Sequence, residues 1–188
     1  MNSPSDSYSL FCFENVKNMD SENGSGIFPL LEKLTINLGI TNVYKSCECL
    51  ETFEQGLETL LYEDKKINDY EVIYMIFYGQ HNKILIDGYV YSFEEIAEYF
   101  QGKLNGKILH FANTMQLDLD LETAQYFLDI TGAKAISGYH KRAPFLSTTL
   151  DYHFFEIYQE TNDIIELTEI ILDKHYTLSQ AMGFRIYY

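Results

Sequence analysis

Cysteine thiols, a threonine hydroxyl and histidine imidazoles are the side chains of this sequence that could carry out group transfer. The cysteines are Cys12, Cys47 and Cys49, and the threonine is Thr114, which follows an apolar run that predicts a strand. A thiol or a hydroxyl becomes a strong nucleophile only when a base lies within hydrogen-bond reach. His81 is the candidate base, so the sequence offers Thr114 or Cys47 with His81 as a candidate hydrolase pair.

The same residue types could instead bind a metal ion. Cys47-Glu48-Cys49 together with His81 or His140 would supply sulfur, carboxylate and imidazole donors. The C-x-C spacing lacks, however, the paired C-x₂-C spacing that is typical of structural zinc sites. We therefore expect free thiols, no metal site and no cofactor.

Two further candidates lie inside apolar runs that predict buried strands. His110 precedes Phe111 in such a run, and we expect it to be a structural imidazole with satisfied hydrogen bonds. Cys12 lies in another apolar run, where a free cysteine behaves as a small hydrophobic residue. Neither residue is expected to take part in catalysis.

Composition excludes direct binding to nucleic acid. The chain carries 28 acidic and 13 basic residues, a formal net charge of −15, and its basic residues form no cluster. Such a surface repels a phosphate backbone. The acidic residues are spread along the chain rather than gathered in a stripe, which favours solvated helix faces over an acidic mimic of nucleic acid. If charge selects a partner, we expect a protein with a basic surface.

The sequence predicts one cytoplasmic domain. A chain of 188 residues with 46% hydrophobic residues suits a single domain over residues 1–188, with a polar arm at residues 1–8. No run approaches the ~20 apolar residues that cross a bilayer, and the first residues do not match a signal peptide. An odd number of cysteines, three, fits a reducing compartment.

Alternating strand and helix patterns position the candidate side chains. We expect strands at residues 9–14, 43–46, 71–78, 107–111, 133–137 and 184–188. We expect helices at residues 29–38, 52–61, 92–104 and 121–131, a helix that Pro144 opens, and a helix at residues 163–172. This order predicts an α/β fold with a mostly parallel sheet of about six strands and helices on both faces.

A small β-hairpin is expected after the central strand, because Asp87-Gly88 is a type I′ turn dipeptide between two short apolar runs. In an open parallel sheet, functional side chains gather beyond the carboxyl ends of the strands. That rule selects residues 78–82, 112–116, 138–141 and 47–49 as the candidate site.

Several short motifs in this order resemble those of caspase-like cysteine peptidases of the CHAT type, in the clan of caspases, gingipains and separases. Phe77-Tyr78-Gly79 ends a buried strand, and a hairpin and a capped helix follow it. His110-Phe111-Ala112-Asn113-Thr114 ends the next strand. Thr131-Gly132-Ala133 and Ser137-Gly138-Tyr139 further along the chain are also similar to that family. The resemblance extends from Ser9 to Tyr188 and implies a three-layer caspase-like sandwich.

The resemblance also implies where a catalytic pair would lie. In such enzymes a His-Gly ends one strand and a Cys ends its neighbour, so that the imidazole activates the thiol. Here the His position falls on Tyr78, with Gly79 retained, and the Cys position falls on Thr114, or on Asn113 if the loop is shifted by one residue. An unperturbed tyrosine, with a pKa of about 10, is a poor base at neutral pH.

Two functions follow from this reading. The first is a catalytically inactive caspase-like domain that acts through protein contacts, with its former cleft either filled by Tyr78 and Asn113 or reused to hold a peptide segment. Its expected binding residues are Tyr78, His81, Asn113, Thr114, Tyr139 and His140. The second is a peptidase or hydrolase with a relocated nucleophile and base.

Overall fold

A central sheet of six strands organises the computed structural model, which describes residues 9–16, 26–143 and 146–188. The strand order across the sheet is β2-β1-β3-β7-β8-β9. The strands are β1 (Ser9–Asn15), β2 (Thr41–Cys47), β3 (Tyr70–Ile76), β7 (Ile108–Phe111), β8 (Ala135–Tyr139) and β9 (Phe184–Tyr187). The first five strands in this list are parallel to one another, and β9 pairs antiparallel with β8.

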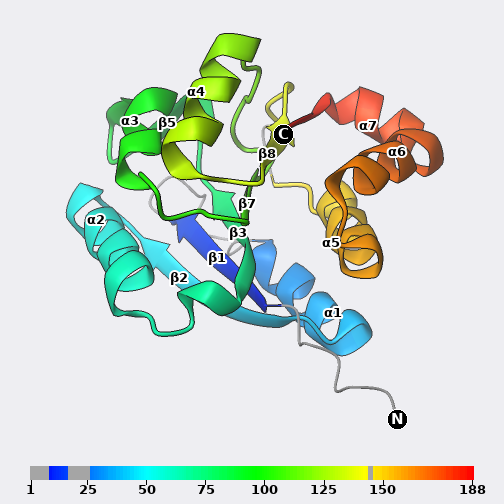
Figure 1. The fold of residues 1–188 in the computed structure, drawn as a ribbon, viewed down its shortest axis with the longest axis horizontal. Helices are drawn as coiled ribbons and strands as arrows, with labels where there is room; N and C mark the ends of the chain where they lie inside the picture. The colour runs from blue at the N-terminus through cyan, green and yellow to red at the C-terminus, as the bar shows by residue number, and fades with distance from the viewer. Residues whose placement is uncertain (1–8, 17–25, 144–145) are drawn as a thin grey trace.

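Helices cover both faces of this sheet and make the three layers that the sequence predicts (Figure 1). One face carries α2 (Leu50–Glu58), α3 (Phe93–Tyr99) and α4 (Leu121–Thr131). The other face carries α1 (Ile27–Leu38), α5 (Thr149–Thr161), α6 (Ile164–Lys174) and α7 (Tyr176–Met182). A π-helical turn at Thr59–Glu63 continues α2, and a short 3₁₀ turn at Ile67–Asp69 leads into β3. Within the described residues, no helix has the length and apolarity to cross a bilayer.

The continuous apolar run of β3 explains its central place. Ile73 and Met75 point into the hydrophobic core beneath α2, α3 and α4, whereas Val72, Tyr74 and Ile76 point into the core beneath α1, α5 and α6. A strand that is buried on both faces needs apolar side chains at every position, because neither face meets water. The prediction of a central strand here is confirmed.

Capping residues fix the starts of two helices that flank the site. Ser92 caps α3 as predicted, since its hydroxyl accepts from the Glu95 amide at 3.2 Å and the Glu95 carboxylate accepts from the Ser92 amide at 2.6 Å. The predicted start of α2 at residue 52 was wrong. The helix begins earlier, with Cys49 at its N-cap, and Thr52 accepts a hydrogen bond from the Cys49 amide at 3.1 Å.

The predicted hairpin is present and is larger than expected. It contains β5 (Lys83–Ile86) and β6 (Tyr89–Ser92), and Asp87 and Gly88 form the turn with φ of 48° and 80°. A third strand, β4 (Gly79–Gln80), pairs with β5, so the hairpin belongs to a separate sheet of three strands rather than to the edge of the central sheet.

The C-terminal part differs from the sequence prediction in two respects. Pro144, expected to open a helix, lies outside the described residues, and α5 begins at Thr149. Helix α7 was not predicted, because it is short and only its partly buried Leu178 and Met182 pack on the core. The predicted last strand is confirmed as β9, which ends at Tyr187.

A stacked pair of histidines joins α5 to the junction between α6 and α7. The rings of His153 and His175 lie 4.0 Å apart between centroids, with Glu156 and Lys174 nearby. Burial lowers the pKa of His175 from its ordinary value of 6.5, and the charge of His153 lowers it further. The unfolded chain therefore binds a proton more readily than the folded chain as the pH falls below about 6.5.

We accordingly expect the domain to lose stability below about pH 6.5, until His175 itself is protonated in the folded state. Urea unfolding of the wild type and of His175→Gln at about pH 7.5 and about pH 5.5 measures this effect. The wild type should lose more of its unfolding midpoint than the variant between the two values. An equal loss in both proteins would show that His175 is not the group responsible.

Candidate functional site

A cleft of about 450 Å³ opens where β3 passes into the hairpin, at the carboxyl edge of the central sheet. Most of its wall comes from the hairpin, and one residue comes from the segment after β8. The lining residues are Tyr78, Gly79, Gln80, His81, Lys83, Ile84, Leu85, Val90 and Arg142. The volume falls within the range of small-molecule and peptide-side-chain sites, ~300–1,000 Å³.

Tyr78 lines this cleft. It is half-buried, and the guanidinium of Arg142 lies 5.5 Å from the centroid of its ring. The Tyr78 carbonyl accepts a hydrogen bond from the Leu85 amide at 2.7 Å, which fastens the hairpin to the end of β3. The phenol is thus a wall of the cleft, and the cation–π contact sets the position of a flexible arginine beside it.

Thr114 and Asn113 follow β7 and are buried beside the end of β3. Thr114 is fully buried, and its hydroxyl donates to the Phe77 carbonyl at 2.8 Å. The Asn113 side chain accepts from the Ser147 amide at 3.1 Å, and its carbonyl accepts from the Ala143 amide at 2.7 Å. Both residues therefore brace neighbouring backbone segments, and neither lines the cleft.

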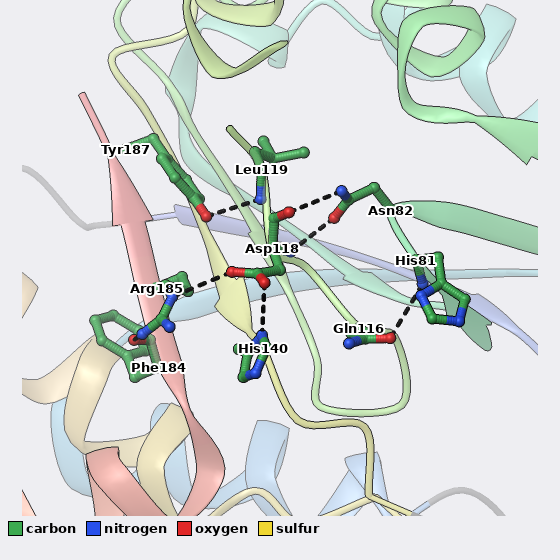
Figure 2. Close-up of polar contacts among 9 residues, drawn as sticks. All are labelled: His81, Asn82, Gln116, Asp118, Leu119, His140, Phe184, Arg185 and Tyr187. Atoms are coloured by element: carbon green, nitrogen blue, oxygen red, sulfur yellow. Dashed lines mark hydrogen bonds and ion pairs between the residues drawn. The ribbon is translucent and has the colours of Figure 1, made fainter. Parts of the chain in front are cut away.

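His81 and Asn82 turn the chain between β4 and β5 with positive φ values of 54° and 59°. The His81 imidazole is exposed at the cleft, while its amide donates to the Gln116 side chain at 3.2 Å. Asn82 holds the backbone of Asp118 on both sides, donating to its carbonyl at 2.9 Å and accepting from its amide at 2.6 Å (Figure 2). The turn is thereby tied to the loop that follows β7.

His140 and Arg185 both face the carboxylate of Asp118 (Figure 2). His140 lies 2.9 Å from one carboxylate oxygen and Arg185 lies 3.5 Å from the other. The Tyr187 hydroxyl accepts a hydrogen bond from the Leu119 amide at 2.9 Å. His140, one of the expected binding residues, therefore belongs to a surface cluster beside the cleft rather than to its lining.

The cysteines differ sharply in environment. Cys12 and Cys47 are buried, and burial raises the pKa of the Cys47 thiol to about 12 and that of the Cys12 thiol well above its ordinary value. Cys49 is half-buried at the N-cap of α2, where hydrogen bonds from Thr52 lower the pKa of its thiol. In the described part of the chain, no three metal-binding side chains gather closely enough to hold an ion.

We expect iodoacetamide to alkylate Cys49 first, because alkylation needs an accessible thiolate. Cys47 and Cys12 should react only after denaturant is added. Peptide mapping by mass spectrometry during a short exposure near neutral pH measures the order, with Cys49→Ser as the control that should remain unlabelled in the folded state. Equal labelling of Cys47 and Cys49 in the folded protein would contradict these environments.

A buried polar network that no local sequence pattern reveals lies on the other face of the sheet. His110 on β7 contacts the Ser137 hydroxyl at 2.8 Å and the Asp151 carboxylate at 3.0 Å, and Tyr74 and Tyr139 donate to the same carboxylate. All five side chains have an exposed fraction of 0%. The set contains a serine, a histidine and an aspartate, but no substrate could reach it, so its role is structural.

Tyr139 belongs to this network and not to the cleft. It was expected among the binding residues because it ends a parallel strand, yet its ring is buried and its hydroxyl bonds to Asp151. The pKa of Tyr139 is raised, first by burial and then by the charge of Asp151, which keeps the phenol protonated as a donor. His110 is the structural imidazole that the apolar run predicts.

Comparisons with known proteins identify a family and a similar fold. The model of the family described as "Family of unknown function (DUF6642)" matches residues 7–188. A crystal structure of caspase-1 from Spodoptera frugiperda superposes with a TM-score of 0.53 and 15% sequence identity, over 97% of this chain and 86% of that chain. At this level of identity the similarity establishes the fold alone. A search of curated protein sequences found no match.

Proposed function

The chain belongs to the family DUF6642 and has a caspase-like fold, and from this premise we propose that it is a catalytically inactive caspase-like domain that acts as a protein-interaction or regulatory module. Its partner is a protein, and the cleft beside the hairpin takes a peptide segment of that partner. Because a shared fold does not carry a shared activity, the proposal rests on the side chains at the cleft.

The observation that carries the proposal is the state of the two positions at which the resemblance would put a catalytic pair. Tyr78 occupies the first position and supplies a phenol in place of an imidazole. Thr114 occupies the second, and its hydroxyl is fully buried and engaged with the Phe77 carbonyl at 2.8 Å. A nucleophile must be reachable by substrate and activated by a base. Thr114 meets neither condition, and Asn113 is not a nucleophile.

Contacts of the cleft support a binding role. Arg142, Tyr78 and the hairpin leave an open volume of about 450 Å³ rather than a filled one. Of the two fates considered for the former cleft, reuse is therefore better supported than filling by Tyr78 and Asn113, since Asn113 is 2% exposed and braces the loop after β8. An overall charge of −15 would in addition favour a partner with a basic surface around the inserted segment.

A relocated hydrolase site has less support. Cys47 is buried with a thiol pKa of about 12, so it is protonated at neutral pH. Thr114 donates its hydroxyl to the Phe77 carbonyl, and within the described residues no hydrogen bond joins the Thr114 side chain to the exposed imidazole of His81. Geometry comes before pKa in identifying a catalytic pair.

Covalent probes test the proposal. Electrophilic probes for cysteine and threonine nucleophiles, together with a fluorogenic peptide library, would be applied to the wild type and to Thr114→Ala, Cys47→Ser and His81→Ala. We expect no turnover in any of the four proteins, and no labelling that is lost in Thr114→Ala or His81→Ala. Cys49→Ser serves as a control for simple alkylation of the accessible thiol. Turnover that disappears in one of the three variants would instead assign a relocated catalytic site.

A further inference from the structure

The cleft differs in charge from the rest of the molecule. Three of its lining residues, His81, Lys83 and Arg142, are exposed and basic or titratable, and none of the lining residues is acidic. The chain as a whole has a net charge of −15 and only 13 lysines and arginines. An acid-free wall with a lysine and an arginine is therefore a local exception on an acidic protein.

We propose that this cleft binds an acidic, extended polypeptide segment, which adds as a strand to the free edge of β6. This inference deepens the proposed function, on which it rests, because it names the chemistry of the partner segment. Two independent features carry it: the cations that line the cleft and, within the described residues, the unpaired backbone edge of β6.

Electrostatic complementarity accounts for the acidic character of the segment. A carboxylate held near Arg142 or Lys83 would form a charge-assisted hydrogen bond, and the guanidinium is already positioned 5.5 Å from the Tyr78 ring centroid. Charges that lie farther from the cleft than the Debye length, about 8 Å in physiological salt, act only weakly on a segment bound there. Local cations therefore decide which segment enters the cleft, even on an acidic chain.

Asp118, the nearest acidic residue in the surface cluster, does not neutralise these cations. Its carboxylate contacts His140 at 2.9 Å and Arg185 at 3.5 Å, and its backbone carbonyl accepts a hydrogen bond from Asn82 (Figure 2). The cluster therefore engages Asp118 with His140 and Arg185, and among the residues that the structure describes neither Lys83 nor Arg142 forms a salt bridge.

The hydrogen-bond pattern of the hairpin identifies which backbone groups are free. Leu85 and Val90 are opposite each other in the antiparallel pair of β5 and β6. The Leu85 amide donates to the Tyr78 carbonyl at 2.7 Å, away from β6, so this pair is of the non-hydrogen-bonded kind. The amide and carbonyl of Val90 consequently point outward, and in the described part of the chain no strand pairs with that edge.

An added strand would place its side chains over the cleft. Val90 and Leu85 share one face of the hairpin and both line the cleft, and Lys83 lies two residues from Leu85 on the same face. A residue of the segment opposite Val90 would project to that face as well, beside the cations. Val90 and Tyr89 are 56% and 66% exposed, so the edge is accessible. Strand addition gives affinity through the backbone and specificity through alternate side chains.

Peptide binding measured by fluorescence polarisation tests the inference. The probes are peptides with alternating valine and glutamate and charge-reversed peptides with lysine in place of glutamate. We expect the acidic peptides to bind, and Lys83→Glu/Arg142→Glu to weaken them at least about tenfold. The matched control is Lys65→Glu/Lys66→Glu, which makes the same charge change at two exposed lysines outside the cleft and should have little effect.

A second pair of variants tests strand addition separately. Val90→Pro removes the outward amide without breaking the pairing with β5, and should weaken binding about three- to tenfold, whereas the β-branched Val90→Thr keeps the amide and should bind as the wild type does. Stronger binding of the lysine peptides, equal binding by all variants, or binding of neither peptide would overturn the inference. None of those results would be evidence of catalysis. Cleavage of a bound peptide, in contrast, would overturn the proposed function.

Discussion

Replacing Asp151 with alanine is expected to lower the free energy of unfolding by about 3–5 kcal/mol. Asp151 lies in the first turn of α5 and has an exposed fraction of 0%, and its carboxylate accepts hydrogen bonds from Tyr74, Tyr139 and His110. Removing the acceptor leaves three buried donors, on three different strands of the sheet, without a partner. The loss is a large fraction of the ~5–15 kcal/mol that stabilises an ordinary domain.

Urea unfolding followed by circular dichroism measures this loss. Asp173→Ala is the matched control, because that carboxylate is exposed on α6 and its removal should change stability by less than about 0.5 kcal/mol. Asp151→Asn should fall between the two, since the amide keeps an acceptor oxygen but also adds donors in the same space. Similar unfolding midpoints for Asp151→Ala and Asp173→Ala would contradict the network.

Replacing Gly79 with alanine is expected to destabilise the hairpin and to cost about 1–3 kcal/mol of stability. A Cβ atom at this position would lie 1.9 Å from the Lys83 carbonyl oxygen and 3.2 Å from the Met115 side chain. The backbone of Gly79 also donates to the Thr114 carbonyl at 3.3 Å and accepts from the Gln116 amide at 3.4 Å. An added methyl group must therefore displace either the β5 backbone at Lys83 or the loop after β7 that contains Thr114 and Gln116.

Hydrogen exchange locates the damage from this variant. Amides of β5, above all Leu85, should lose protection in Gly79→Ala, while those of β1 and β3 keep it. Gly26→Ala is the control, because a Cβ there meets no atom within 4 Å and its φ of −64° suits any residue. Unchanged protection of Leu85 would mean that the hairpin does not depend on a glycine at position 79.

Gly79 fits the family motif for a structural reason rather than a catalytic one. By resemblance, Gly79 is the retained half of a His-Gly motif. In the structure, the absence of a side chain at Gly79 allows the backbone of Lys83 to approach closely. The hairpin needs this approach whether or not a catalytic histidine precedes the glycine. A motif that reflects geometry can persist when the chemistry next to it has changed.

Local patterns predicted most of the fold because they depend on neighbours in sequence. The apolar run of β3, the capping box of Ser92 and Glu95 and the Asp87-Gly88 turn each encode their structure within a few residues. Helix α7 escaped prediction because its seven residues carry few apolar contacts. The early start of α2 escaped because a cysteine, Cys49, occupies a cap position that serine or threonine usually fills.

The site was predicted less completely, because it depends on residues that are distant in sequence. The carboxyl-edge rule brought Tyr78 and His81 to the cleft but could not distinguish them from Tyr139, which the same rule selected and which faces the core. The contact of Arg142 with Tyr78 could not be predicted, because the two residues are distant in sequence and no local pattern pairs them. Asp151 could not be predicted as part of a buried network, because a lone acid in a helical pattern indicates a solvated face and its partners are distant in sequence.

Affinity selection from a peptide library tests the central claim most directly. The purified domain would be incubated with a diverse library of unmodified peptides, and both the bound peptides and the solution would be analysed by mass spectrometry. Our account predicts that peptides are recovered intact from the domain, that Lys83→Glu/Arg142→Glu loses them, and that no new peptide termini appear in solution. New termini that accumulate with the wild type and disappear in Thr114→Ala, Cys47→Ser or His81→Ala would contradict it.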